Sequence, residues 1–194
     1  MSLDHILLGY LQTPATGYDL GREFEEGARH FWFAERSQIY PTLRRMEKRG
    51  WLESHQAPSE RGPQRKVYTR TQEGLAELRT WLTEEPRIGH ERLAYIAQAA
   101  FLGSVPDLED AIQVVRRMRA VWEQKLAYLE YAESEVLAQA GDWLDQPREA
   151  FHMYSALRLG LAQYRAKLAW CEETIHRLER RRAAAGNDAT EEVP

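Results

Sequence analysis

The residues best suited to a chemical role lie in a short basic segment, SQIYPTLRRMEKRG, which spans residues 37–50. Its apolar residues Ile39, Leu43 and Met46 follow helical spacing, so they are expected to face the protein interior. The exposed face is then predicted to carry polar and basic side chains, namely Gln38, Thr42, Arg45 and Arg49, flanked by Arg44 and Lys48. Gln and Arg can pair with base edges in the major groove, while Arg and Lys further along suit phosphates.

A second basic cluster lies in a segment that is typical of a small β-hairpin. The runs WLESHQ and RKVYTR are compatible with strands, and APSERGP between them carries the Pro and Gly of a turn. Arg61, Arg65 and Lys66 surround this turn and could rest on a neighbouring DNA backbone or in the minor groove. A basic helix alone is equally compatible with an ordinary solvated surface and with a surface that binds nucleic acid. The helix and the hairpin together favour a surface that binds nucleic acid.

The charge distribution along the chain supports this interpretation. The 194 residues carry a formal net charge of -4, but residues 29–70 hold ten Lys and Arg against four Glu, which makes this segment +6. Residues 1–28 sum to -4 and residues 71–194 to -6. A basic island in an acidic chain provides the local positive potential that DNA binding requires.

Pro41 lies close to the expected start of the basic helix. If Ser37 or Gln38 is the N-cap, Pro41 falls at the fourth or third helical position, at the edge of the turn whose amides lack internal partners. The proline is therefore predicted to give a rigid first turn, which leaves amide groups free to meet a phosphate.

The elements that position these residues follow from periodicity. Helices are expected over 3–11, 17–28 and from Ser37 to Gly50, followed by the hairpin. Thr71, or Thr69 before it, caps a fourth helix that runs through Leu82, with Leu75, Leu78 and Leu82 on its buried side. Three helices, a hairpin and a further helix are the order of a winged helix-turn-helix domain, which we place at residues 1–84.

The second part of the chain, residues 85–182, is predicted to be an α-helical dimerisation domain. A short helix over 93–101 precedes two long helices, about 108–140 and 148–182. The last helix carries a seam of apolar residues spaced by three and four, and the dimerisation residues are predicted to be Tyr154, Leu157, Leu161, Tyr164, Leu168, Ile175 and Leu178. A symmetric dimer is the economical way to bury so much apolar surface. Residues 183–194 are predicted to form a disordered tail.

Three segments of the first part resemble the PadR-type winged-helix transcriptional regulators. They are HILLGYLQTPATGYDL, SQIYPTLRRMEKRGWL and RGPQRKVYTRTQEG, which match the family in order and spacing over about residues 3–82. HFWFAERSQIY also resembles the longer subfamily with an extended α-helical C-terminal region. The resemblance implies a fold that is mainly α with a small β-hairpin wing, and a homodimeric DNA-binding regulator, a repressor or an activator.

The resemblance also assigns roles to individual residues. It implies that the third helix enters the major groove through Ser37, Gln38, Tyr40, Thr42 and Arg45. Tyr18 matches a family tyrosine that can reach a phosphate. The wing positions that match the family are Arg61, Gln64, Arg65 and Lys66.

The second part of the chain is rich in aromatic residues, which raises the possibility of an effector site. Some family members sense phenolic or planar aromatic compounds, and Trp81, Trp122 and Trp170 could stack on such a ligand. The alternative, which we favour for the aromatic residues as a group, is plain core and dimer packing. The effector therefore stays a hypothesis at this point.

Other function classes find little support in the sequence. No P-loop, dinucleotide fingerprint or nucleophile elbow is present, so we expect neither an enzyme nor a bound cofactor. The six histidines are scattered, and the single cysteine, Cys171, excludes an internal disulfide and a Cys-rich zinc site. With no signal peptide or apolar run of membrane-spanning length, we expect a cytoplasmic protein that contacts no membrane. The alternative function is a helical protein–protein adaptor whose winged helix binds no DNA.

Overall fold

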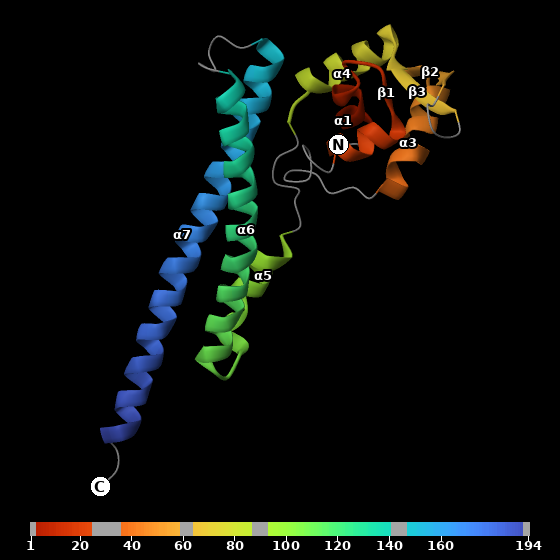
Figure 1. The fold of residues 1–194 in the computed structure, drawn as a ribbon. Helices are drawn as coiled ribbons and strands as arrows, with labels where there is room; N and C mark the ends of the chain where they lie inside the picture. The colour runs from red at the N-terminus through yellow and green to blue at the C-terminus, as the bar shows by residue number, and fades with distance from the viewer. Residues whose placement is uncertain (1–2, 25–35, 59–63, 87–92, 141–146, 192–194) are drawn as a thin grey trace. The chain divides into compact units, whose positions relative to one another are not determined.

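The protein is described by a computed structural model that covers residues 3–24, 36–58, 64–86, 93–140 and 147–191. The chain separates into two compact units, Met1–Glu91 and Arg92–Pro194. The predicted boundary after residue 84 therefore lies near the end of the first unit. Figure 1 shows a small unit of helices and strands and a unit with a pair of long helices.

The first unit is a winged helix-turn-helix. Its elements are, in order, α1 (Leu3–Tyr10), β1 (Ala15–Thr16), α2 (Gly17–Glu23), α3 (Arg36–Lys48), β2 (Leu52–Ala57), β3 (Arg65–Arg70) and α4 (Gln72–Thr83). The strands form an antiparallel sheet in the order β1-β3-β2. Within the described parts the predicted helices and hairpin strands are present. The two-residue strand β1 was not predicted, because it is too short to give an alternating pattern.

The core of this unit is built from leucines on three helices. Leu7 and Leu8 of α1, Leu20 of α2 and Leu43 of α3 are all fully buried. Such burial stabilises the unit by roughly 1.5–3 kcal/mol per large aliphatic side chain. Leu82, which we predicted on the buried side of α4, is instead exposed. It lies in the last turn of α4, where the neighbouring Trp81 and not Leu82 packs against the core.

Two threonines cap the N-termini of α2 and α4. Thr16 closes a capping box, since its hydroxyl oxygen accepts from the Asp19 N–H at 3.1 Å and its backbone N–H donates to the Asp19 carboxylate at 3.3 Å. The hydrogen bond from the Thr16 hydroxyl is the main reason why the pKa of Asp19 is lowered. Thr71 caps α4, as predicted, by accepting from the Gly74 N–H at 3.0 Å. These caps fix the residues at which α2 and α4 begin.

The second unit is a helical hairpin. The short helix α5 (Ala94–Ala100) and a 3-10 turn, η2 (Leu102–Ser104), precede α6 (Leu108–Ala140) and α7 (Arg148–Glu191). The helices α6 and α7 lie side by side along most of α6. The predicted spans of both long helices match these bounds at their N-terminal ends.

The seam that we predicted as the dimerisation surface is buried inside one chain. Its residues pack against a matching stripe on α6 that includes Ile112, Val115, Trp122 and Leu129. Five of the seven seam residues are buried in this cluster, and Leu168 and Leu178 are partly buried against it.

 All seven seam residues therefore pack against α6 within the hairpin. The spacing correctly predicted a buried stripe, but it could not tell which helix covers that stripe.

The predicted disordered tail also differs from the structure. The helix α7 continues through residue 183 and ends at Glu191. Ala183, Ala184 and Ala185 have the highest helix propensity of any residue type, and they extend a helix that is already nucleated. Low apolar content, the basis of the prediction, argues against a packed core but not against a solvated helix.

Candidate nucleic-acid interface

The exposed surface of α3 is centred on a different row of residues from the one predicted. Ile39, Thr42, Leu43 and Met46 are buried, which fixes the inward side of the helix. With 100° of rotation per residue, the opposite side carries an exposed row at spacings of four, three and four, namely Ser37, Pro41, Arg44 and Lys48. Arg44 and Lys48, which we predicted on the flank, therefore lie at the centre of the outward surface.

Thr42 was predicted on the exposed face, and this was wrong. The residue is buried, with only 4% of its surface exposed. Its position lies three residues after Ile39 and four before Met46, which places it on the packed side of the helix. Its hydroxyl oxygen accepts from the Arg45 guanidinium at 3.4 Å, so Thr42 helps to hold the Arg45 side chain in place.

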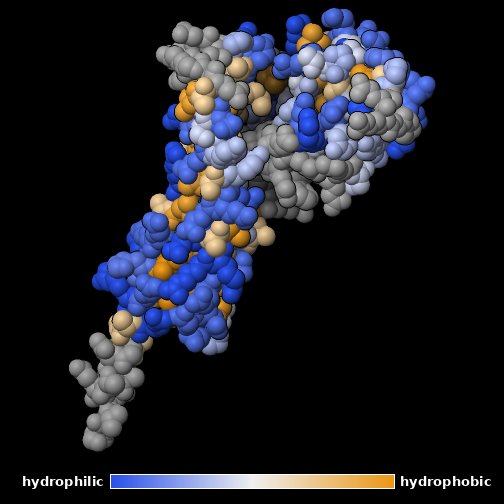
Figure 2. All heavy atoms as spheres, in the orientation of Figure 1, coloured by the Kyte–Doolittle hydropathy of each residue, from blue (hydrophilic) through white to orange (hydrophobic). Residues whose placement is uncertain are grey.

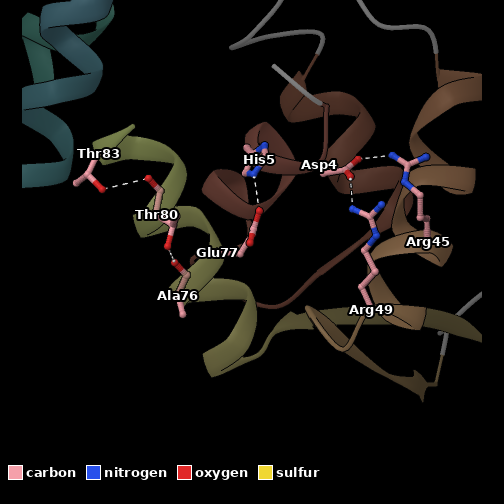
Figure 3. A network of polar contacts seen from close by, with 8 residues as sticks. All are labelled: Asp4, His5, Arg45, Arg49, Ala76, Glu77, Thr80 and Thr83. Atoms are coloured by element: carbon pink, nitrogen blue, oxygen red, sulfur yellow. Dashed lines mark hydrogen bonds and ion pairs between the residues drawn. The ribbon is translucent and has the colours of Figure 1, made fainter. Parts of the chain in front are cut away.

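Arg45 and Arg49 lie on one flank of α3 and are tied to α1. Both pair with the carboxylate of Asp4, as Figure 3 shows. Arg45 pairs through Nη2 with Oδ1, and Arg49 through Nη1 with Oδ2 at 3.6 Å. The Asp4 side chain is nearly buried, whereas both arginines remain about half exposed. The role of Asp4 was not predicted, because an acid in a first helical turn has the ordinary appearance of a helix-dipole partner.

The opposite flank of α3 carries Tyr40 next to the start of α2. A Cβ atom built on Gly17 would lie 2.6 Å from Cε1 of the Tyr40 ring, so the ring rests directly on the glycine backbone. Tyr40 is 46% exposed, and Tyr18, the next residue along α2, is more exposed still. The two tyrosines thus lie beside the capped N-terminus of α2, where amides and hydroxyls can meet a phosphate.

The wing is joined to α3 through Glu47. The Glu47 carboxylate accepts from the Lys66 ammonium at 2.8 Å and from the Ser54 hydroxyl. These hydrogen bonds, that from Lys66 first, hold the pKa of Glu47 below its usual value, and the same contact raises the pKa of Lys66. Both side chains are about one third exposed, so solvent screens the pair. The contact fixes the angle between wing and helix more than it adds stability.

The remaining predicted wing residues are placed only in part. Gln64 and Arg65 are exposed at the start of β3, as a DNA-contacting wing requires. Arg61 lies outside the described residues.

Ser37 and Gln38 are exposed at the first turn of α3. The helix begins at Arg36, two or three residues before the first helical residue that the predicted N-caps imply, so Pro41 lies inside it and cannot donate a regular helical hydrogen bond to the Ser37 carbonyl.

Two of the three predicted effector residues meet in the second unit. The rings of Trp122 and Trp170 are 6.3 Å apart in an edge arrangement, and Tyr95 lies 5.3 Å from Trp122 on its other side. With Lys167 they line a largely apolar cavity of about 530 Å³. Trp81 belongs to the first unit, where its ring stacks on His5 at 4.9 Å. Its predicted role beside the other two tryptophans has no support in the contacts it makes there.

The described part of the chain offers neither a metal site nor a membrane span. Among those residues no group of three or more His, Cys, Asp or Glu side chains is placed to hold a metal ion. No helix in the described ranges combines the length and apolar character needed to cross a bilayer.

The fold and the basic surface together define a winged-helix regulator, and comparisons with known proteins agree. The Transcriptional regulator PadR-like family matches residues 6–80, and the Virulence activator alpha C-term family matches residues 100–179. The chain belongs to the PadR-like family of transcriptional regulators, in its longer form with an extended helical C-terminal region. It is accordingly a DNA-binding regulator and not an enzyme.

Individual relatives match over nearly the whole chain. A probable transcriptional regulator of Mycobacterium tuberculosis is 28% identical over 198 residues, 94% of this chain and 100% of the relative. The negative transcriptional regulator PadR of Bacillus subtilis is 24% identical over 179 residues, 92% of this chain and 98% of the relative. The crystal structure of that PadR with operator DNA has a TM-score of 0.79, covering 91% of this chain and 98% of that chain. Its structure with p-coumaric acid has a TM-score of 0.75, with coverage of 91% and 98%.

Proposed function

We propose that this chain binds a roughly palindromic operator as a homodimer and represses transcription from it. The observation that carries the proposal is the outward row of α3, where Arg44 and Lys48 lie exposed between the two flanks. Exposed cations on a helix that projects from a winged fold suit entry into the major groove. The DNA complex of the Bacillus subtilis relative and its name as a negative regulator support both DNA binding and the sign of regulation.

In this proposal the residues of the site take three roles. The outward row enters the groove, where Ser37 faces base edges and Arg44 and Lys48 bind the phosphates that line it. Tyr18 and Tyr40, beside the N-terminus of α2, contact a phosphate. Gln64, Arg65 and Lys66 of the wing lie along the flanking backbone, with Arg61 of the turn as a further wing contact.

The experiment that tests operator binding is selection of bound fragments from genomic and random DNA with the purified full chain. The proposal expects one enriched motif with inverted half-sites about one helical turn apart, or a multiple of it. A reporter driven by the selected operator should then fall in expression when the protein is present. Retention of DNA without sequence enrichment would contradict operator recognition, and a rise in expression would contradict repression.

The proposed dimer needs a surface other than the buried seam. A second apolar stripe lies on the solvent side of α6, where Val121, Tyr128 and Tyr131 are exposed at spacings of seven and three. Figure 2 shows hydrophobic residues in orange scattered among hydrophilic ones on the visible face of the helical hairpin. Exposed apolar residues that share one helix face are typical of a protein–protein interface. We therefore assign the contact between the two copies to this stripe.

The dimer is tested by sedimentation velocity on the full chain. Val121→Glu with Tyr131→Glu should shift the protein from dimer to monomer, because two charges would have to be buried in the interface. Ser134→Glu, on another side of α6, is the matched control and should leave the dimer intact. A double variant that sediments like the wild type would exclude this stripe as the interface.

A small planar aromatic effector is the remaining part of the proposal. The cavity beside Tyr95, Trp122 and Trp170 is apolar and large enough for one aromatic ring system. The ammonium of Lys167 lies 5.5 Å from the Tyr95 ring and 5.9 Å from the Trp122 ring, so an acidic substituent would find a cation at the cavity wall. The p-coumaric acid complex of the Bacillus subtilis relative supports an effector of this class.

The effector is tested by calorimetric titration of the full chain with p-coumaric acid and related phenolic acids. Binding should weaken by about tenfold or more in Trp170→Ala, which removes one wall of the cavity. Trp81→Phe, in the first unit, should bind as the wild type does. An absence of heat with every phenolic acid, or equal losses in both variants, would contradict the assignment of the effector to this cavity.

A further inference from the structure

The strongest feature of the first unit that the proposed function does not use is the pairing of Asp4 with two arginines of α3. Asp4 lies in the first turn of α1, far from α3 in sequence, and its side chain is only 6% exposed. Both of its carboxylate oxygens are occupied, one by Arg45 and the other by Arg49. Figure 3 shows the two guanidinium groups converging on this one carboxylate from the same helix.

This geometry restrains two half-exposed cations that would otherwise be free to meet DNA without regard to sequence. A buried carboxylate with two guanidinium partners is a fixed structure, since breaking it would leave an uncompensated buried charge. The guanidinium of Arg45 is held further by the Thr42 hydroxyl at 3.4 Å. Of the basic residues on α3, Arg44 and Lys48 lie instead on the outward row, on the side of the helix away from Asp4.

We infer that Asp4 is a positioning residue for sequence discrimination, which fixes Arg45 and Arg49 on the α1 side of α3 and keeps them from binding phosphates indiscriminately. The inference rests on the proposed DNA binding by α3. Affinity for any duplex grows with each phosphate that a mobile cation neutralises, whereas specific binding depends on side chains held in one geometry. A carboxylate that restrains two arginines therefore lowers binding to random DNA more than binding to the operator.

The first test compares Asp4→Asn with the wild type on a random duplex and on the selected operator. Each added phosphate contact steepens the slope of log affinity against log salt by about 0.9, or about 3.5-fold in affinity between about 50 and 200 mM salt. Asp4→Asn should steepen the random-duplex slope by about one to two contacts and lower the operator preference. Glu84→Gln, which makes the same change in net charge at the exposed C-cap that follows α4, should leave both quantities unchanged.

The outcomes separate the inference from the proposed function. If the wild type binds no duplex, the proposed function fails. If it binds and folded Asp4→Asn keeps the wild-type slope and preference, the inference is overturned. A lowered melting temperature alone would show only a structural role, so the salt slope decides.

A second pair of variants keeps the test decisive if Asp4→Asn does not fold. Arg49 is held by Asp4 and is inferred to make no phosphate contact of its own, so Arg49→Gln should change the operator slope by less than about half a contact. Arg44→Gln, on the outward row, should flatten it by about one contact. Equal flattening by both variants would overturn the inference.

Discussion

Gly74 lies where the start of α4 meets the turn that leads from α3 into the wing, and replacing it with alanine should destabilise the first unit. A Cβ atom at this position would lie 2.2 Å from the Trp51 carbonyl oxygen and 3.1 Å from Cδ2 of Leu8. The first distance is far inside van der Waals contact, and the obstacle is backbone, which cannot rotate away. The helix and the chain at Trp51 must therefore separate.

The size of the effect follows from the contacts that this separation disturbs. The Trp51 carbonyl accepts from the Thr71 N–H at 3.1 Å, and the Gly74 N–H donates to the Thr71 cap. Losing each of these contacts costs about 1 kcal/mol. Overpacking adds about 1–3 kcal/mol, and the better helix propensity of alanine returns about 1 kcal/mol. We expect a net loss of about 2–4 kcal/mol in the free energy of unfolding.

The assay is urea unfolding of the full chain followed by circular dichroism, with hydrogen exchange of residues 72–83 to locate the loss. The midpoint of the first unit should fall by about 1 M urea or more, given a slope of about 1–2 kcal/mol/M. Gly9→Ala is the matched control, since no atom lies within 4 Å of its added Cβ. It should be neutral or slightly stabilising. The reasoning is refuted if Gly74→Ala is as stable as Gly9→Ala.

Three further predictions test other parts of the account. In Gly17→Ala the added Cβ would lie 2.6 Å from the Tyr40 ring and displace it. Operator binding measured by fluorescence anisotropy should weaken by about tenfold while the fold is retained. Unchanged affinity would exclude Tyr40 from the interface. Because the folded pKa of Glu47 is lowered, its contact with Lys66 stabilises the protein above the ordinary carboxyl pKa and is lost as pH falls through the folded value. The free energy of unfolding should therefore fall less steeply below about pH 4.5 in Glu47→Gln than in the wild type. Identical curves of unfolding free energy against pH would argue against the contact. Burial raises the pKa of Cys171 to about 11, so the thiol should resist alkylation at pH 7 until urea unfolds α7, whereas rapid native labelling would show it to be exposed.

Much of the first unit could be predicted because its signals are local. Ile39, Leu43 and Met46 gave the inward side of α3, and all three are buried. Thr71 was correctly predicted as the cap of α4, since a cap is a contact between residues close in sequence. Thr42 was misplaced because a polar residue on the edge of a buried stripe is assigned to solvent unless its neighbours in space are known.

Contacts between distant segments could not be predicted in the same way. The pairs formed by Asp4 join residues more than forty positions apart, and no periodicity connects them. The apolar seam that includes Leu161 is an equally clear case, because it is buried as expected but by α6 of the same chain. Hydrophobic spacing predicts that a surface is covered, and only the fold shows which segment covers it.

The central claim is that the outward row of α3 binds DNA, and the salt dependence of operator binding tests it most directly. Wild-type protein and the double variant Arg44→Gln with Lys48→Gln would be titrated against the selected operator over a series of salt concentrations. We predict that the double variant flattens the slope of log affinity against log salt by about two phosphate contacts, or about 1.8 units, while its melting temperature stays that of the wild type. A slope equal to that of the wild type would contradict the claim.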